Sequence, residues 1–343
     1  MRLVVSSLYK NTKQNYFLLV FSELIVIDNF QLCSMQNQNV ITTAILLSIA
    51  LIVIPVFAIF YDVPLIDLQK QVLKNLVYAM LAVVLVCYIV GELTKNYSQT
   101  DKLWSIMPFF YVLYVAYASN WQPRLVLMLF VVGIWSARLT YNFGRRGGYS
   151  WKFWSGEEDY RWTVLRQDPF LQGKIRFSIF HLLFICLYQQ ALILAFTLPA
   201  VVVLNATKAI GFVDYILAAL LIGFVIIELI ADQQQWNFQT QKHKKIKAGK
   251  PLNEEQQNGF ISSGLWSKVR HPNYASEQSI WIVFYLMSVV ATGRWLNWSM
   301  AGCVLLVLLF QGSANFSEGI SSTKYPEYLN YIKRVPRFLP KFW

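Results

Sequence analysis

One stretch of the chain, residues 264–277, reads GLWSKVRHPNYASE and combines cationic, amide, phenolic and acidic side chains. Pro272 is suited to the first turn of a helix, and Asn273 to capping that turn. Backbone N–H groups at a helix start attract anions. Arg270 and His271 add cationic donors just before it, and arginine matches phosphate bidentately. The stretch therefore predicts a site for a phosphate-rich ligand, with an interfacial cap that contacts lipid headgroups as the alternative.

A second polar pattern lies upstream, on a helix that we expect to continue past the membrane. Its members fall at positions i, i+4, i+7, i+11 and i+14, so they share one helix face: Glu228, Asp232, Gln235, Gln239 and Lys242. In the same way, Asn273 and Glu277 share a face of the following helix. The stripe predicts one wall of a polar pocket that opens to the cytoplasm. A solvated helix extension is the alternative interpretation.

The elements that must position these residues are membrane helices. The chain has 343 residues, 56% of them hydrophobic and 14% charged, whereas soluble domains carry about 25% charge. Because a bilayer core needs about 20 apolar residues in a helix, we expect spans at 41–60, 76–94, 103–118, 124–143, 177–198, 211–231, 275–292 and 296–311. The sequence thus predicts an all-α, polytopic helical bundle with about eight transmembrane helices.

The distribution of basic residues predicts how this bundle is oriented. Most of the 30 lysine and arginine residues fall in the N-terminal segment, the loops 95–102, 144–176 and 232–274, and the C-terminal tail. Positive charge marks the cytoplasmic side, so both termini are expected there. The net charge of +12 then reflects topology and attraction to lipid headgroups, and no nucleic-acid partner is expected.

Two further features bear on a site. Arg138 lies late in the fourth expected span, where an ionisable group is costly and usually functional, although snorkelling towards Arg145 is an equal alternative. The tail KYPEYLNYIKRVPRFLP (324–340) predicts a short helix that ends at Pro336. This helix is either an amphipathic surface anchor or a lid that adds Tyr325, Tyr328 and Arg334 to the pocket. The scattered cysteines show no metal spacing, and no phosphate-binding motif of the soluble nucleotide folds is present.

The stretch 264–277, two following hydrophobic spans and the tail resemble the steroid 5-alpha-reductase-like membrane oxidoreductases. Within them, the chain is most similar to a subgroup classed as a domain of unknown function. The resemblance covers roughly residues 100–343. It implies NADPH in a cytoplasm-facing pocket, hydride transfer to an activated C=C bond of a lipid or steroid-like substrate from the bilayer, and a location in the endoplasmic reticulum. Ala275 and Ser276 stand where the subgroup has Phe-Gly. The N-terminal glutamate and tyrosine of true steroid 5-alpha-reductases are not recognisable, which argues against a steroid itself.

The resemblance also implies which residues surround the cofactor: Asp232, Arg270, His271, Asn273, Tyr274, Glu277, Glu318, Tyr325, Tyr328 and Arg334. The stripe adds Gln235, Gln239 and Lys242 to this cofactor-binding set, and the motif adds Trp266. No catalytic residue is predicted, and no metal ligand. Residues 1–40 are expected to form an N-terminal extension, and residues 41–343 a single membrane domain whose cofactor-binding part covers about residues 228–343.

Two other functions fit the same residues. Isoprenylcysteine carboxyl methyltransferases and phospholipid methyltransferases share the ArgHisPro-x-Tyr segment and a tyrosine-rich tail, which implies S-adenosylmethionine and a lipid-linked methyl acceptor. The length of the polar stripe and the loop 144–176 favour the reductase. A non-catalytic lipid-binding or transport protein is the third hypothesis. Transporters often contain internal repeats and interrupted helices near the midplane, whereas the polar residues here gather at one membrane face.

Overall fold

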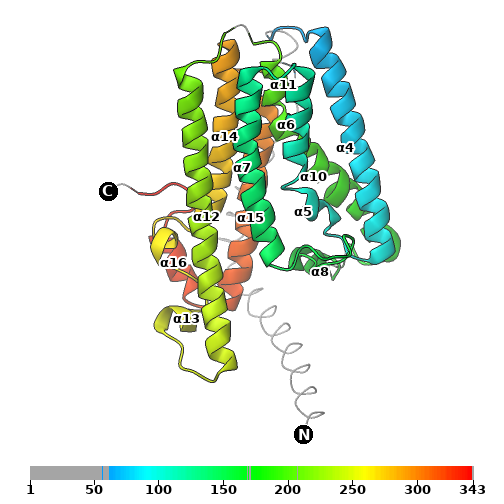
Figure 1. The fold of residues 1–343 in the computed structure, drawn as a ribbon. Coiled ribbons are helices and arrows are strands. Elements are labelled where there is room, and N and C mark those ends of the chain that lie inside the picture. Colours follow the sequence, from blue (N-terminus) through cyan, green and yellow to red (C-terminus); the bar gives the residue numbers. More distant parts are fainter. Residues whose placement is uncertain (1–55, 57–61, 168, 170, 207, 342–343) are drawn as a thin grey trace. The chain divides into compact units, whose positions relative to one another are not determined.

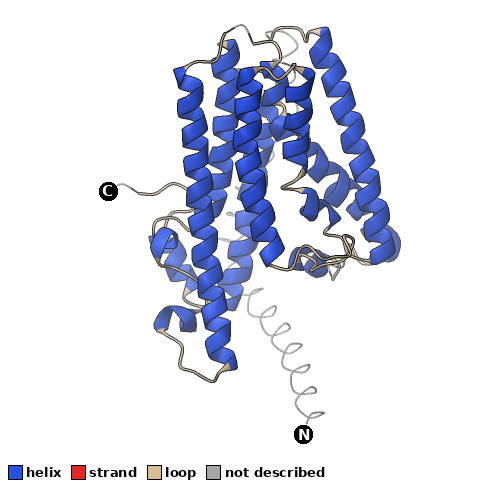
Figure 2. Ribbon diagram, in the orientation of Figure 1, coloured by secondary structure: helices blue, strands red, loops and turns tan. Residues whose placement is uncertain are grey.

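The computed structural model describes residues 56, 62–167, 169, 171–206 and 208–341. All of them belong to the compact unit 50–343, which is separate from the unit 1–49. The described part is built from helices and loops and contains no strand (Figure 2), which confirms the all-α fold class. The expected N-terminal extension, and the expected span 41–60 except for Val56, lie outside the described residues.

The elements follow one another as helices of very different length (Figure 1). They are α4 (Asp67–Thr94), α5 (Gln99–Leu103), α6 (Met107–Ala118), α7 (Pro123–Arg145), α8 (Tyr160–Leu165), α9 (Lys174–Phe180), the π-helix η2 (His181–Tyr188), α10 (Gln189–Thr197), α11 (Pro199–Val203), α12 (Phe212–Lys247), α13 (Glu254–Asn258), the 3-10 helix η3 (Gly264–Ser267), α14 (Pro272–Thr292), α15 (Met300–Lys324) and α16 (Tyr328–Arg334).

Five helices of the described part are long and apolar enough to cross a membrane: α4, α7, the continuous run Lys174–Val203, α12 and α15. Around α4 and α12, large apolar side chains point outwards and are exposed, among them Leu81, Leu85, Val86, Ile226 and Ile230. A bilayer is the solvent that accepts such a surface, since in water large contiguous apolar patches are rare. The chain is therefore an integral membrane protein.

The remaining expected spans coincide with α6 and α14. Helix α6 is apolar but has only 12 residues. Helix α14 is long enough, yet its first turns carry the polar residues of the 264–277 motif, and it does not reach the apolarity of the other five. Its polar and apolar residues alike are largely buried, and it packs along α12, α11 and α15. Helix α14 is thus surrounded by protein, so its sequence does not need to match lipid.

Helix boundaries follow the local signals in the sequence. Helix α14 begins at Pro272 and ends before Gly293, which adopts a φ of 72°, a backbone conformation that glycine reaches without strain. Asn273 is wrong as the predicted cap, because its side chain makes no capping bond there. Helix α12 continues to Lys247, which confirms that this helix extends beyond the expected span 211–231. Helix α16 ends before Pro336, as the tail pattern predicted.

The core runs through α4, α6, α7, α10, α11, α12 and α14 and is built mainly from valine and leucine, with two tryptophan and two phenylalanine side chains among them: Trp135, Phe196, Trp281 and Phe284. The ring centroid of Trp281 lies 4.9 Å from that of Trp135 and 4.2 Å from that of Phe196. All three side chains are fully buried. These rings fix the spacing of α7, α10 and α14, and they enclose the polar groups described below.

One end of the α7–α12 pair is fastened by a buried ion pair. The Arg124 guanidinium donates from Nε to Asp214 Oδ1 at 2.7 Å and from Nη2 to Asp214 Oδ2 at 2.9 Å. Its remaining donors bond to the backbone carbonyls of Lys208 and Ala209. Both side chains are at most 2% exposed. One cation meets one anion, and each of the three guanidinium nitrogens makes at least one hydrogen bond, which is what a stable buried pair requires.

Helices α10 and α15 approach each other most closely at Gly302. A Cβ atom added there would lie 2.1 Å from the carbonyl oxygen of Ala195. We expect Gly302→Ala to lower the free energy of unfolding by about 1–3 kcal/mol, because the backbones would have to separate. Thermal unfolding in detergent measures this. Gly312→Ala on the same helix is the control, since nothing lies within 4 Å of its added Cβ. Equal melting of the two variants would contradict the prediction.

Candidate functional site

Three helices bring a group of ionisable side chains together inside the bundle. Arg138 comes from α7, Glu228 and Asp232 from α12, and Glu277 from α14. Arg138 Nη1 donates to Asp232 Oδ2 at 2.9 Å. Its Nη2 lies 2.8 Å from Glu228 Oε1 and 3.8 Å from Glu277 Oε2. The exposed fractions of the four residues are between 3% and 7%. We call these four residues the Arg138 centre.

Neutral donors complete the shell around two of the three acids. Both oxygens of Glu277 accept indole hydrogen bonds, Oε2 from Trp135 at 2.8 Å and Oε1 from Trp281 at 3.0 Å. Asp232 accepts from Asn142 Nδ2 at 2.7 Å and from Asn273 Nδ2 at 3.4 Å. These donors stabilise negative charge on Glu277 and Asp232.

Several polar atoms at and beside the Arg138 centre have no hydrogen-bond partner among the described residues. They are Glu228 Oε2, Gln235 Oε1, Asn273 Oδ1, Arg145 Nη2 and, on Arg138 itself, Nε and Nη2, the latter only in ion-pair contact with Glu228 and Glu277. Buried polar groups in folded proteins are nearly always paired, and each exception calls for an explanation such as a ligand or a water molecule. Arg145 is joined to the centre through its Nε, which donates to Asn142 Oδ1 at 2.8 Å. The centre therefore combines spare acceptors with a spare guanidinium donor at its edge.

A second charged cluster lies where α14 begins, and it involves two predicted phosphate-binding residues. Arg270 Nε donates to Glu318 Oε1 at 2.8 Å, and the same oxygen lies 2.9 Å from His271 Nε2. Arg337 Nη2 donates to Glu318 Oε2 at 2.6 Å. Arg270 Nη1 also bonds to the carbonyls of Ile332 and Val335. We call Arg270, His271, Glu318 and Arg337 the Glu318 clamp; the anion that its cations contact is a carboxylate of the protein itself.

The Glu318 clamp also joins the C-terminal segment to the start of α14 through the backbone. The Arg270 N–H donates to the Pro336 carbonyl at 2.8 Å, and the His271 N–H to the Arg337 carbonyl at 3.2 Å. The Tyr274 ring stacks on the His271 ring with centroids 5.2 Å apart. The segment after α16 therefore lies against the start of α14 and is held there by both main-chain and side-chain hydrogen bonds.

The polar stripe of α12 divides between two environments. Glu228 and Asp232 belong to the Arg138 centre, whereas Lys242 lies farther along the helix. Its Nζ donates to the Gly259 carbonyl at 2.8 Å and lies 5.4 Å from the Tyr325 ring centroid. Gln239 is partly exposed. Trp266 donates from Nε1 to the Ala231 carbonyl at 3.2 Å and so fastens η3 to α12.

The tail places its aromatic residues against the segment that follows α13. The Phe260 ring centroid lies 4.9 Å from that of Tyr328 and 6.0 Å from that of Tyr325. Burial, with the nearby Glu318 carboxylate, raises the pKa of Tyr328 to about 12, so its hydroxyl keeps its proton at neutral pH. Arg334 is exposed, and its Nε bonds to the Asn330 carbonyl. The tail thus supplies buried tyrosines but not Arg334 to the interior.

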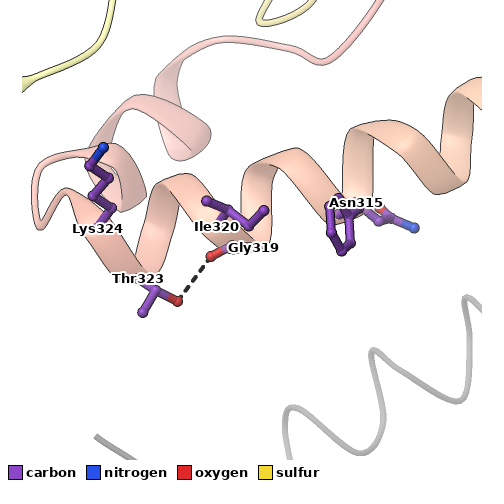
Figure 3. A pocket seen from close by; sticks show the side chains of 6 residues that line it. Asn315, Gly319, Ile320, Thr323 and Lys324 are labelled. Carbon is purple, nitrogen blue, oxygen red and sulfur yellow. Dashed lines mark hydrogen bonds between the residues drawn. The ribbon is translucent and has the colours of Figure 1, made fainter. Parts of the chain in front are cut away.

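A cavity of about 560 Å³ lies along α15, beside the Glu318 clamp (Figure 3). It is lined by Asn315, Phe316, Gly319, Ile320, Thr323 and Lys324. Asn315 connects it to the clamp, because its Oδ1 accepts a bond of 2.7 Å from Arg337 Nη1. The cavity does not contact the Arg138 centre, and its lining is mostly apolar.

Reasoning from the sequence missed the neutral members of the Arg138 centre. Trp135, Asn142 and Trp281 have no motif around them, and Arg138 itself was weighed only as an isolated intramembrane cation. Two signals were available. Arg138 and Asn142 lie four residues apart and so share a face of α7, and Trp281 lies four residues after Glu277. Neither signal shows which helix each face meets.

These features define a polytopic α-helical membrane protein with a buried ionic centre among three helices and a C-terminal segment clamped to the start of one of them. The chain belongs to the family described as "Protein of unknown function (DUF1295)", whose model matches residues 87–335. An uncharacterized protein of Schizosaccharomyces pombe is 36% identical over 263 residues, which cover 72% of this chain and 74% of that protein. No solved structure matches the chain.

Proposed function

We propose that the protein is a membrane-embedded, NADPH-dependent reductase that transfers a hydride to a C=C bond of a lipid or steroid-like molecule from the bilayer. The observation that carries the proposal is the meeting of Asp232, Asn273 and Glu277 at the Arg138 centre. These three residues match cofactor-surrounding positions of the steroid 5-alpha-reductase-like enzymes, and they come from two helices, Asp232 from α12 and the other two from α14. Their convergence is what a shared ligand would require.

The chemistry of the Arg138 centre fits the nicotinamide end of NADPH. The carboxamide and ribose hydroxyls of the cofactor are hydrogen-bond donors, and spare acceptors lie at Gln235 Oε1 and Asn273 Oδ1. When bound, the cofactor would supply a hydride and become positively charged. An excess of buried carboxyl groups favours that positive charge. Asp232, Asn273 and Gln235 would orient the ring and exclude water.

The phosphates need cationic donors that the protein has not already used. Arg270 is engaged with Glu318 and two backbone carbonyls. Arg145, the last residue of α7, has an unpartnered Nη2. Its guanidinium lies 4.9 Å from the ring centroid of Trp236 on α12. We therefore assign Arg145 as a phosphate-binding residue. Arg270 has a positioning role in this proposal, because it fixes the C-terminal segment beside the pocket.

We further propose the topology expected from the sequence: the protein has eight transmembrane spans, with both termini in the cytoplasm. Its location is the membrane of the endoplasmic reticulum. The supports are the bias of lysine and arginine towards one set of loops and the resemblance to the reductases. In this topology, Arg145, the extension of α12 and α16 all face the cytoplasm, where NADPH is available.

Thermal unfolding of the purified protein in detergent, with NADPH and S-adenosylmethionine titrated in parallel, tests the proposal. We expect NADPH to raise the melting temperature, since a ligand at about 100 times its dissociation constant adds about 2.7 kcal/mol to the stability. Asn273→Ala should weaken this stabilisation. Asn330→Ala is the matched control, because Asn330 is exposed on α16. Stabilisation by S-adenosylmethionine alone would overturn the reductase assignment.

A methyltransferase is the second candidate, and the same observation favours it. S-adenosylmethionine carries a positive sulfonium, which the surplus carboxyl groups of the Arg138 centre also accommodate. It carries no phosphate, however, so it gives no role to Arg145. An Arg145→Gln variant separates the two candidates: it should weaken NADPH binding and leave S-adenosylmethionine binding unchanged.

A further inference from the structure

The Arg138 centre holds more acid than base. Three carboxyl groups, from Glu228, Asp232 and Glu277, surround the single guanidinium of Arg138. By contrast, the Arg124–Asp214 pair, which joins α7 to α12, has one acid and one base. Full ionisation of the Arg138 centre would leave two uncompensated negative charges in a bundle interior, where an unpaired charge is very costly and is avoided by neutralisation.

The hydrogen bonds show which of the three acids carries a proton. Glu277 receives two indole N–H donors, and Asp232 receives donors from Arg138, Asn142 and Asn273. Glu228 contacts Arg138 through Oε1 only, and its Oε2 receives no donor from the described residues. Glu228 and Glu277 both approach Nη2 of Arg138, at 2.8 Å and 3.8 Å. Two carboxylates that face one guanidinium nitrogen repel each other, and a proton on Glu228, the acid with the fewest donors, relieves this repulsion.

Among the residues that the structure describes, no other acid or base alters this count. Helices α6 and α11 and the 3-10 helix η3 present no charged side chain to the Arg138 centre, and Glu318 of α15 is engaged by Arg270, His271 and Arg337. On α7, Arg145 contacts the amide of Asn142, not an acid of the centre. The surplus of carboxyl groups therefore remains.

We propose that the Arg138 centre stores a proton on Glu228, and that this proton leaves when a positively charged ring occupies the site. With one proton stored, the four residues carry a formal charge of −1. A bound cation makes the charge neutral while the proton stays. It also makes loss of the proton cheaper, because the added positive charge compensates the new carboxylate.

Applied to the proposed reductase, on which this step rests, the stored proton is the second hydrogen of the reduction. A hydride adds to one carbon of the C=C bond. The O–H bond of Glu228 breaks, and its proton goes to the other carbon. The electrons balance, because the cofactor is oxidised by two electrons and the double bond is reduced by two. The Glu228 carboxylate that forms is paired by Arg138, and a proton from solvent restores the resting state.

Infrared spectroscopy of the ligand-free protein tests the stored proton directly. A protonated carboxyl group has a C=O stretch separate from that of a carboxylate, and we expect this band in the resting protein. Glu228→Gln should remove it. Glu277→Gln provides a second variant, and it should shift the band because the neighbouring negative charge beside Arg138 Nη2 is removed. The control Asp67→Asn, whose side chain is 99% exposed, should leave the band intact. Persistence of the band in both glutamine variants, or its absence from the wild type, would overturn the proposal.

Calorimetry of nucleotide binding in two buffers with different ionisation enthalpies tests proton release. We expect NADP⁺ to release about one proton more than NADPH at the same pH, and Glu228→Gln to abolish the difference, by proton linkage. An equal release from both nucleotides in the wild type would contradict the link to a cationic ring. If neither nucleotide binds, the proposed reductase function fails, and the infrared result still decides whether Glu228 stores a proton.

Discussion

Arg138→Met is expected to lower the free energy of unfolding by about 3–5 kcal/mol, because it leaves carboxyl groups buried without their cation. The guanidinium contacts Glu228, Asp232 and Glu277, which come from two other helices. Methionine fills similar volume, so a packing defect contributes little. Thermal unfolding in detergent measures the loss. The same variant should no longer be stabilised by NADPH, since the acids that face the ligand lose their arrangement.

A rescue experiment distinguishes loss of charge pairing from loss of side-chain packing as the cause of the lower stability. Adding Glu228→Gln and Glu277→Gln to Arg138→Met removes two of the acids that the guanidinium compensated, and the triple variant should regain most of the lost stability. Replacing all members of a buried ionic group by neutral residues often leaves the stability unchanged, whereas removing one partner alone lowers it strongly. Arg138→Met melting like the wild type, or a triple variant no more stable than Arg138→Met, would show that the Arg138 centre is not held by charge pairing.

The positions of the helices were largely predictable, because the signals for them are local. A run of apolar residues, Pro272 at a helix start and Pro336 after a helix end each act within a few residues of chain. The extension of α12 was predictable for the same reason, since its polar stripe repeats with the helical period. Helix α14 shows where local reasoning stops. Its composition is less apolar than that of a lipid-facing span, because its surroundings are other helices.

The partners of the charged residues were not predictable, because they depend on which helix faces meet. The motif 264–277 predicted that Arg270 and His271 meet a phosphate-rich ligand, and in the structure they contact the Glu318 carboxylate, 48 residues beyond Arg270. Arg138 meets Asp232 across 94 residues of sequence. The candidate set chosen from types and spacing included Asp232, Asn273 and Glu277, which the structure brings together at the Arg138 centre. It could not separate those that pair within the protein from those with atoms left for a ligand.

Arg270→Met is expected to release the C-terminal segment from the bundle. Arg270 is 8% exposed and bonds to Glu318 and to the carbonyls of Ile332 and Val335. Its loss removes the side-chain bonds that hold the end of α16, and it breaks a buried ion pair, which costs about 3–5 kcal/mol. Limited trypsin digestion in detergent measures the release. The variant should be cut after Lys333 and Arg334 much faster than the wild type.

Arg334→Met controls for the loss of a basic residue near the cleavage site, because Arg334 is exposed and bonds only to the Asn330 carbonyl. It should leave cleavage after Lys333 slow. The variant Glu318→Gln tests the other side of the Glu318 clamp. It removes the acceptor of Arg270, His271 and Arg337 together, and it should also accelerate cleavage. If Arg270→Met leaves the tail resistant to trypsin, the backbone bonds of Arg270 and His271 to residues 336 and 337 are sufficient to hold it. Arg270 would then be free to serve a ligand, as its place in the motif first indicated.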